Sequence, residues 1–231
     1  MTASDWTHVP VEANRDARRP RIVSRRRARA LAPWIMAGVT MFPVAVLSHE
    51  LGHYLISRAF GFPGVVLHYG SISDPSSSDF WTFVREGRFR DAAAIHPLWQ
   101  PPLVALGGLV VSYATALASY WHTAHRRPNP YVIALGTIAV FRFVGGVPLI
   151  FVRLLMPSAR PSSDETHAAL DRVPPELALL AVGFAMLWLV WWRMPRLLPA
   201  EGRRARLVAL VVGSVVGGAL YIGLVGPRLL P

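Results

Sequence analysis

Long apolar runs alternate with short polar segments along the chain, and this alternation is the main structural signal in the sequence. A helix needs about 20 predominantly apolar residues to cross a bilayer. The runs that predict such helices are about 31–60, 101–121, 131–155, 177–192 and 207–225. The pattern therefore predicts an all-α integral membrane protein with about five transmembrane helices, which form a single domain over residues 31–231.

The segment 61–100, between the first two runs, has a mixed pattern. Residues 65–69 (VVLHY) and 80–84 (FWTFV) are short runs rich in β-branched and aromatic residues, and a Ser-rich loop separates them. Such runs are typical of short strands, so we expect a small β-hairpin or a re-entrant element here. An exposed edge could hold a substrate strand, although the aromatic residues favour the alternative role of interfacial anchors.

Composition supports the membrane prediction and narrows the partners. Of the 231 residues, 53% are hydrophobic and only 16% are charged, and the formal net charge is +11. Such a charge could indicate nucleic acid, but the arginines cluster beside the apolar runs, which is typical of contact with a lipid bilayer. We therefore expect no nucleic-acid partner. The chain has no Cys, which excludes disulfides and thiolate metal sites.

The distribution of arginine predicts an orientation. All 24 basic residues are Arg, and residues 1–30, 122–130 and 193–206 hold eight, two and five of them. The segments 61–100 and 156–174 hold three and two. The positive-inside rule then places the N-terminus in the cytoplasm of a multi-pass cell-membrane protein. Residues 1–30 are predicted to be a basic disordered tail that lies against anionic headgroups.

The first apolar run contains the sequence Ser48-His49-Glu50-Leu51-Gly52-His53-Tyr54, which has the H-E-x-x-H pattern. Histidines four residues apart lie on one face of a helix, where both can bind one Zn²⁺. Glu50 is placed beside the pair and can act as a general base on a zinc-bound water. Ionisable residues inside a membrane span are costly, so their presence indicates function.

A hydrophobic helix that carries H-E-L-G-H in a small multi-span protein resembles the site-2 protease family of intramembrane zinc metalloproteases. The resemblance covers about Val44 to Phe60. It implies intramembrane proteolysis with His49 and His53 as zinc ligands, Glu50 as the catalytic residue and a distant Asp as the third ligand. In the family that Asp often lies in a Leu-Asp-Gly segment, and this chain contains no such tripeptide, which makes it a divergent member.

The residues offer one candidate stretch for the third ligand. Asp164, Glu165 and His167 lie in a polar break between two apolar runs, far from His49 in the sequence. Asp164 is the preferred ligand, and Glu165 and His167 are the alternatives. Ser163 and Asp164 also have the pattern of a helix N-terminus, so either could serve as its cap, and capping and metal binding could both occur in this one loop.

Together these observations predict a zinc-dependent intramembrane endopeptidase. Its substrate would be a membrane protein or peptide, cleaved within or next to the bilayer, with Glu50 activating the water. The alternative is a non-enzymatic metal-binding scaffold or a transporter. A transporter is expected to carry ionisable residues in several spans and an internal repeat, whereas here only the first and third runs carry such residues.

Overall fold

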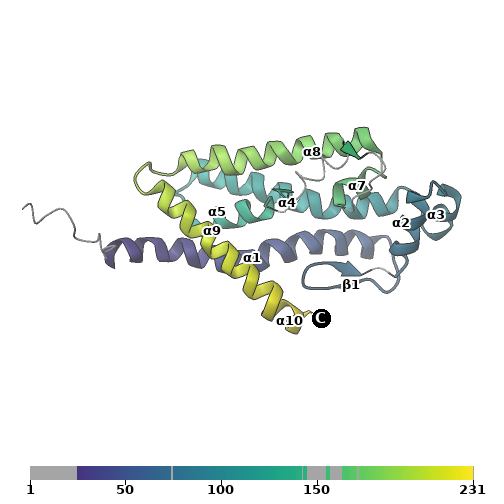
Figure 1. The fold of residues 1–231 in the computed structure, drawn as a ribbon, viewed down its shortest axis with the longest axis horizontal. Helices are drawn as coiled ribbons and strands as arrows, with labels where there is room; N and C mark the ends of the chain where they lie inside the picture. The colour runs from purple at the N-terminus through teal and green to yellow at the C-terminus, as the bar shows by residue number, and fades with distance from the viewer. Residues whose placement is uncertain are drawn as a thin grey trace, which may run out of the picture.

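The computed structural model describes residues 25–73, 75–141, 143–144, 155–156, 163–170 and 172–230. Most of the predicted N-terminal tail therefore lies outside the described residues. The described part is mostly helical and elongated, with α1, α4 and α8 running along its long axis and α9 crossing α1 (Figure 1).

Four helices are long and apolar enough to cross a membrane, and they span residues 29–59, 100–125, 173–197 and 203–229. These are α1 (Arg25–Ala59), α4 (Gln100–His125), α8 (Val173–Trp188) with its extensions η1 (Leu189–Arg193) and η2 (Met194–Leu197), and α9 (Arg203–Leu220) with η3 (Tyr221–Val225) and α10 (Gly226–Leu229). Four such helices fit a multi-pass membrane protein.

The third predicted span differs from the expectation. In the described residues it consists of α5 (Pro130–Ala139), a ten-residue apolar helix. At about 1.5 Å per residue such a helix covers about 15 Å, roughly half of the hydrocarbon core. The described residues thus contain four spanning-length helices where five were predicted, and most of 142–155 lies outside them.

The segment 61–100 contains the predicted hairpin but with different bounds. Strands β1 (Val66–Leu67) and β2 (Ile72–Ser73) pair antiparallel. The second predicted strand, 80–84, is wrong, because it lies in helix α2 (Ser77–Arg85), which is followed by α3 (Phe89–Ile95). The helix buries two of its side chains against α3, and this packing outweighs the β propensity of the aromatic residues.

Glycines allow α9 to approach the first half of α1 closely. A Cβ added at Gly213 would clash with the Ile35 carbonyl oxygen, and one added at Gly217 would lie 2.6 Å from Val39 O. The Val39 carbonyl oxygen, which Gly217 approaches, receives no hydrogen bond from residue 43 of the same helix, because Pro43 has no N–H. Gly213 and Gly217, four residues apart in the sequence, therefore serve helix packing, as GxxxG motifs commonly do.

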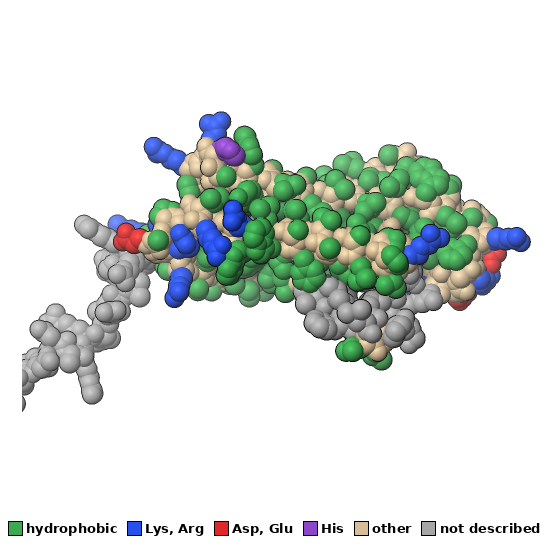
Figure 2. Space-filling model, turned by 90° about the horizontal axis from the view of Figure 1, so that it is seen from above, with side chains coloured by type: hydrophobic (Ala, Val, Ile, Leu, Met, Phe, Trp, Pro, Cys, Tyr) green, Lys and Arg blue, Asp and Glu red, His purple; other side chains and the backbone are tan. Residues whose placement is uncertain are grey.

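The two ends of the molecule carry different elements. The start of α1, the connection from α4 to α5 and the turn between α8 and α9 lie at one end, whereas α2, α3 and α7 (Asp164–Ala168) lie toward the other (Figure 1). Arginine side chains gather at the ends and apolar side chains cover the middle (Figure 2). This distribution suits a molecule that crosses a bilayer, and the orientation remains a prediction.

Candidate metal centre

The two histidines of the H-E-x-x-H pattern lie on the face of α1 that packs on α4. Both are buried, with 4% and 6% of His49 and His53 exposed. Their Nε2 atoms are 2.9 Å apart and their rings are edge to face. The helical spacing has therefore brought both imidazoles to one point, as the sequence predicted.

Asp164 completes this group from a distant part of the chain. Its Oδ2 lies 3.0 Å from His49 Nε2 and 3.3 Å from His53 Nε2. Asp164 is not the cap of α7, because the Thr166 N–H donates to Ser163 Oγ over 3.1 Å. Ser163 thus occupies the N-cap position, and the Asp164 carboxylate is directed at the histidines.

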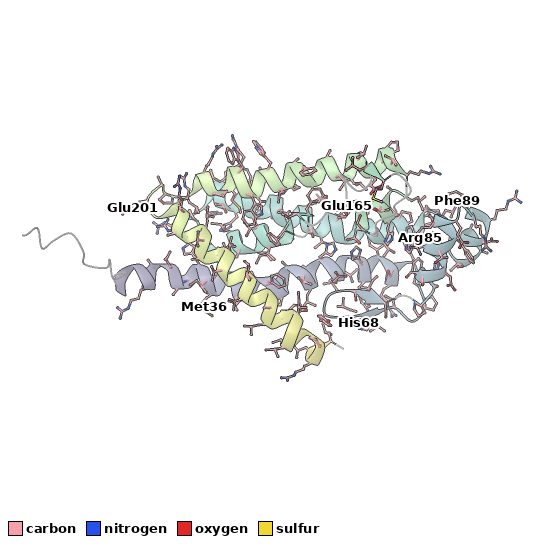
Figure 3. The ribbon with its side chains drawn as sticks, in the orientation of Figure 1. Met36, His68, Arg85, Phe89, Glu165 and Glu201 are labelled. Atoms are coloured by element: carbon pink, nitrogen blue, oxygen red, sulfur yellow. The ribbon has the colours of Figure 1, made fainter. Side chains whose placement is uncertain are left out.

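The other two candidate ligands are placed differently. Glu165 is buried on α7, between α4 and α8 (Figure 3), and His167 stacks on Trp81 of α2 with 4.2 Å between ring centroids. Among the described residues, the group close enough together to hold a metal ion is His49, His53 and Asp164.

The donor atoms fit a tetrahedral metal site. Ligands about 2.0–2.1 Å from one zinc ion at tetrahedral angles are separated from one another by about 3.3 Å. The three separations in the structure are 2.9, 3.0 and 3.3 Å. A metal ion would therefore require donor shifts of only a few tenths of an ångström, and the group could hold one.

Contacts from α4 determine which ring nitrogen of neutral His53 carries the proton. Its Nδ1 lies 2.7 Å from the Val104 carbonyl oxygen, which can only accept a hydrogen bond, so Nδ1 carries the proton and donates it. The Gly108 N–H is 3.4 Å from the same nitrogen, a longer and weaker approach. With Nδ1 protonated, Nε2 of the neutral ring has a lone pair available for a metal.

His49 also has a hydrogen-bond partner on α4. Its Nδ1 lies 2.9 Å from Ser112 Oγ, and Ser112 is buried. A hydrogen bond from Nδ1–H to this hydroxyl would again leave Nε2 free to bind a metal and would fix the orientation of the ring. Helix α4 therefore holds both imidazoles in place, although it supplies no metal ligand itself.

Two glycines of α4 make room for this arrangement. A Cβ added at Gly107 would lie 2.6 Å from Gly52 O, so the backbones of α1 and α4 are in close contact there. A Cβ added at Gly108 would lie 2.5 Å from His49 Cε1 and would clash with His53 Nε2. Gly107 thus allows the helices to approach, and Gly108 leaves the space that the imidazoles occupy.

A cavity of about 400 Å³ adjoins His53 and Asp164. Its lining includes Glu50, His53 and Asp164, together with Trp81, His167 and the hairpin residues 70–72. The predicted general base therefore lines the same cavity as His53 and Asp164. The cavity holds several times the roughly 30 Å³ of one water molecule.

Helix α7, which carries Asp164, is tied to its neighbours by side chains. The Thr166 hydroxyl donates to Glu176 Oε1 of α8 over 2.8 Å, and both residues are buried. The stack of His167 on Trp81 links α7 to α2. These contacts position the third candidate ligand.

Sequence reasoning did not identify the hydrogen-bond partners that α4 supplies to the two imidazoles. Ser112 could have been noticed as a polar residue in an apolar run, whereas the carbonyl of Val104 leaves no trace in the sequence. Comparison of the chain with protein-family models, with curated proteins and with solved structures found no match. The resemblance to the site-2 protease family therefore rests on the motif and its setting.

Proposed function

We propose that the protein is a zinc-dependent intramembrane endopeptidase, a divergent relative of the site-2 proteases, that cleaves a membrane-protein substrate within or next to the bilayer. One observation carries the proposal. Two buried histidines and a carboxylate converge beside a cavity lined by Glu50, inside a set of helices long enough to span a membrane.

The donor set favours zinc over other common metals. Two imidazole nitrogens and one carboxylate oxygen are a usual protein ligand set for catalytic zinc, which keeps its fourth position open. Magnesium and calcium prefer sites made of oxygen atoms alone. A zinc ion held by His49, His53 and Asp164 would supply Lewis-acid catalysis for hydrolysis of a peptide bond.

The chain itself contributes a base, fixed ligands and a protected space. Glu50 faces the cavity, so its carboxylate can accept a proton from an attacking water and return it to the leaving amine. Val104 O and Ser112 orient the two imidazoles. The surrounding helices bury His49 and His53, and the polar residues of the cavity offer a route for water.

Replacement of Glu50 tests the proposal. Glu50→Gln keeps the shape of the side chain but removes the base. We expect the purified variant to keep its zinc and to lose cleavage of a model transmembrane substrate by a factor of about 10² or more. Glu201→Gln is the matched control, because Glu201 is exposed at the far end of the molecule (Figure 3).

The outcomes separate the protease from the alternatives. Wild-type turnover by Glu50→Gln would refute the mechanism. Zinc binding by the wild type without cleavage of any membrane-protein substrate would favour the metal-binding scaffold or the transporter, in which Glu50 would have no role in proton transfer.

A further inference from the structure

A second feature lies at the end of the molecule away from the metal centre, where α8 continues into η1 and η2. The Arg193 guanidinium carbon lies 5.5 Å from the centroid of the Trp188 ring, and that of Arg196 lies 4.2 Å from the Trp192 ring. The two tryptophans are 54% and 55% exposed. Because they are four residues apart on a helix, the two pairs lie on the same side.

A cation–π contact leaves the N–H donors of an arginine available for other partners. A guanidinium that lies over an indole uses its flat face for the cation–π contact, and its N–H groups point outward in its plane. Within the described residues, no ion pair joins Arg193 or Arg196 to a carboxylate. In-plane N–H groups of arginine form bidentate hydrogen bonds with phosphate oxygens.

The backbone that follows the two arginines in the sequence is held in a turn by hydrogen bonds from Arg203. Arg203 Nη2–H donates to Leu198 O over 2.7 Å, and its Nε–H donates to the same oxygen over 3.2 Å. Leu198 follows directly after η2 and is buried. This clamp closes the connection between α8 and α9, so the site is presented by a defined element.

The helical stretch that carries the two pairs is apolar. Phe184, one turn before Trp188 and on the same side of the helix, is exposed, and the stretch is long and apolar enough to lie in a bilayer. A ligand that satisfies the whole surface must combine an anionic group for the guanidiniums with an apolar part for the helix. We propose that Arg193 and Arg196, in cation–π contact with Trp188 and Trp192, bind the phosphate headgroup of an anionic phospholipid.

The test uses the full-length protein in phosphatidylcholine nanodiscs that contain a minor fraction of brominated phosphatidylglycerol or of brominated phosphatidylcholine. Bromine quenches nearby tryptophan fluorescence, so the ratio of the two quenching signals reports preference for the anionic lipid. A basic residue near a membrane surface contributes roughly a fivefold preference. We therefore expect a preference of that order or more in the wild type and a fall of at least about fivefold in Arg193→Gln/Arg196→Gln.

Three comparisons decide the outcome. Arg85→Gln/Arg90→Gln, at the opposite end, should keep the wild-type preference, and an equal loss there would reduce the effect to net charge. The lipid preference of Arg193→Lys/Arg196→Lys should lie between those of the wild type and the Gln variant, because lysine lacks the planar guanidinium. If the Lys variant kept the wild-type preference, the proposed site would be wrong. Inorganic phosphate, which has no acyl chains, should not displace the lipid, and displacement would show a soluble-anion site instead.

Discussion

Helix α1 makes two close crossings with other helices, and both depend on glycine. Toward its start it packs on α9, where Gly213 and Gly217 face the backbone oxygens of Ile35 and Val39. Toward its end it packs on α4, where Gly52 and Gly107 are in backbone contact. The same packing device therefore occurs twice along one helix.

The crossings differ in what lies beside the glycine contact. At the α1–α9 crossing the neighbours are apolar, and the core there includes Trp34, Ala37 and Leu210. At the α1–α4 crossing one further glycine, Gly108, lies against the imidazoles of His49 and His53. Glycine at the α1–α9 crossing thus serves helix packing alone. At the α1–α4 crossing, ionisable side chains occupy the space that a glycine leaves, and among the described residues only this crossing can hold a metal ion.

The largest effect is expected from removing the carboxylate at the α1–α4 crossing. Asp164→Ala takes away one of three candidate ligands, so we expect zinc affinity to fall by a factor of 100 or more, above the range of about 10–100 for residues that only support ligands. Metal analysis after dialysis against competing chelators measures it. His167→Ala removes only a contact that positions α7, so its loss of zinc affinity should be smaller, within about 10- to 100-fold. A larger loss there than in Asp164→Ala would move the assignment to His167.

A smaller effect is expected from filling the space beside the imidazoles. Gly108→Ala should displace one or both rings, and zinc affinity should fall by roughly 10- to 100-fold, as for residues that orient ligands. Gly223→Ala is the matched control, because a Cβ at Gly223 meets nothing within 4 Å. If Gly108→Ala bound zinc as tightly as Gly223→Ala, the role assigned to Gly108 would be wrong.

The smallest effect on zinc is expected at the other crossing. Gly213→Ala places a methyl group against the backbone of α1, and overpacking of this kind costs about 1–3 kcal/mol of folding free energy. Thermal unfolding in detergent should show the loss, while the zinc affinity of the folded protein stays at the wild-type value. A fall in zinc affinity as large as in Gly108→Ala would show that the two crossings are coupled.

The sequence predicted the parts of the site that depend on local spacing. His49 and His53 share a helix, so their convergence follows from the helical period alone. Asp164 was preferred because a carboxylate in a polar break between apolar runs can reach a metal held by the first run, and the structure places this carboxylate beside both histidines. Of the two predicted caps of α7, Ser163 is confirmed and Asp164 is wrong.

Features that depend on contacts between distant segments were not predictable. The run 80–84 has strand composition, yet Phe80 and Val84 become buried on a helix against Ala92. The hydrogen bond to Val104 O involves a backbone carbonyl that any residue could supply. The apolar run 131–155 likewise predicted a fifth span, whereas the described residues show only the ten-residue α5 there. An apolar composition does not determine the residue at which a helix ends.

The tethering of α7 has a consequence for the energetics of the whole centre. A five-residue helix is too short to be stable by itself, so Asp164 stays in place only while Thr166 holds Glu176 and His167 stacks on Trp81. Docking of α7 and capture of the metal are then linked equilibria, and each must favour the other by the same free energy. Binding of the metal would therefore stabilise the docked position of α7. A substitution that weakened the packing of α7 on α8 or α2 would in turn lower metal affinity without changing a ligand.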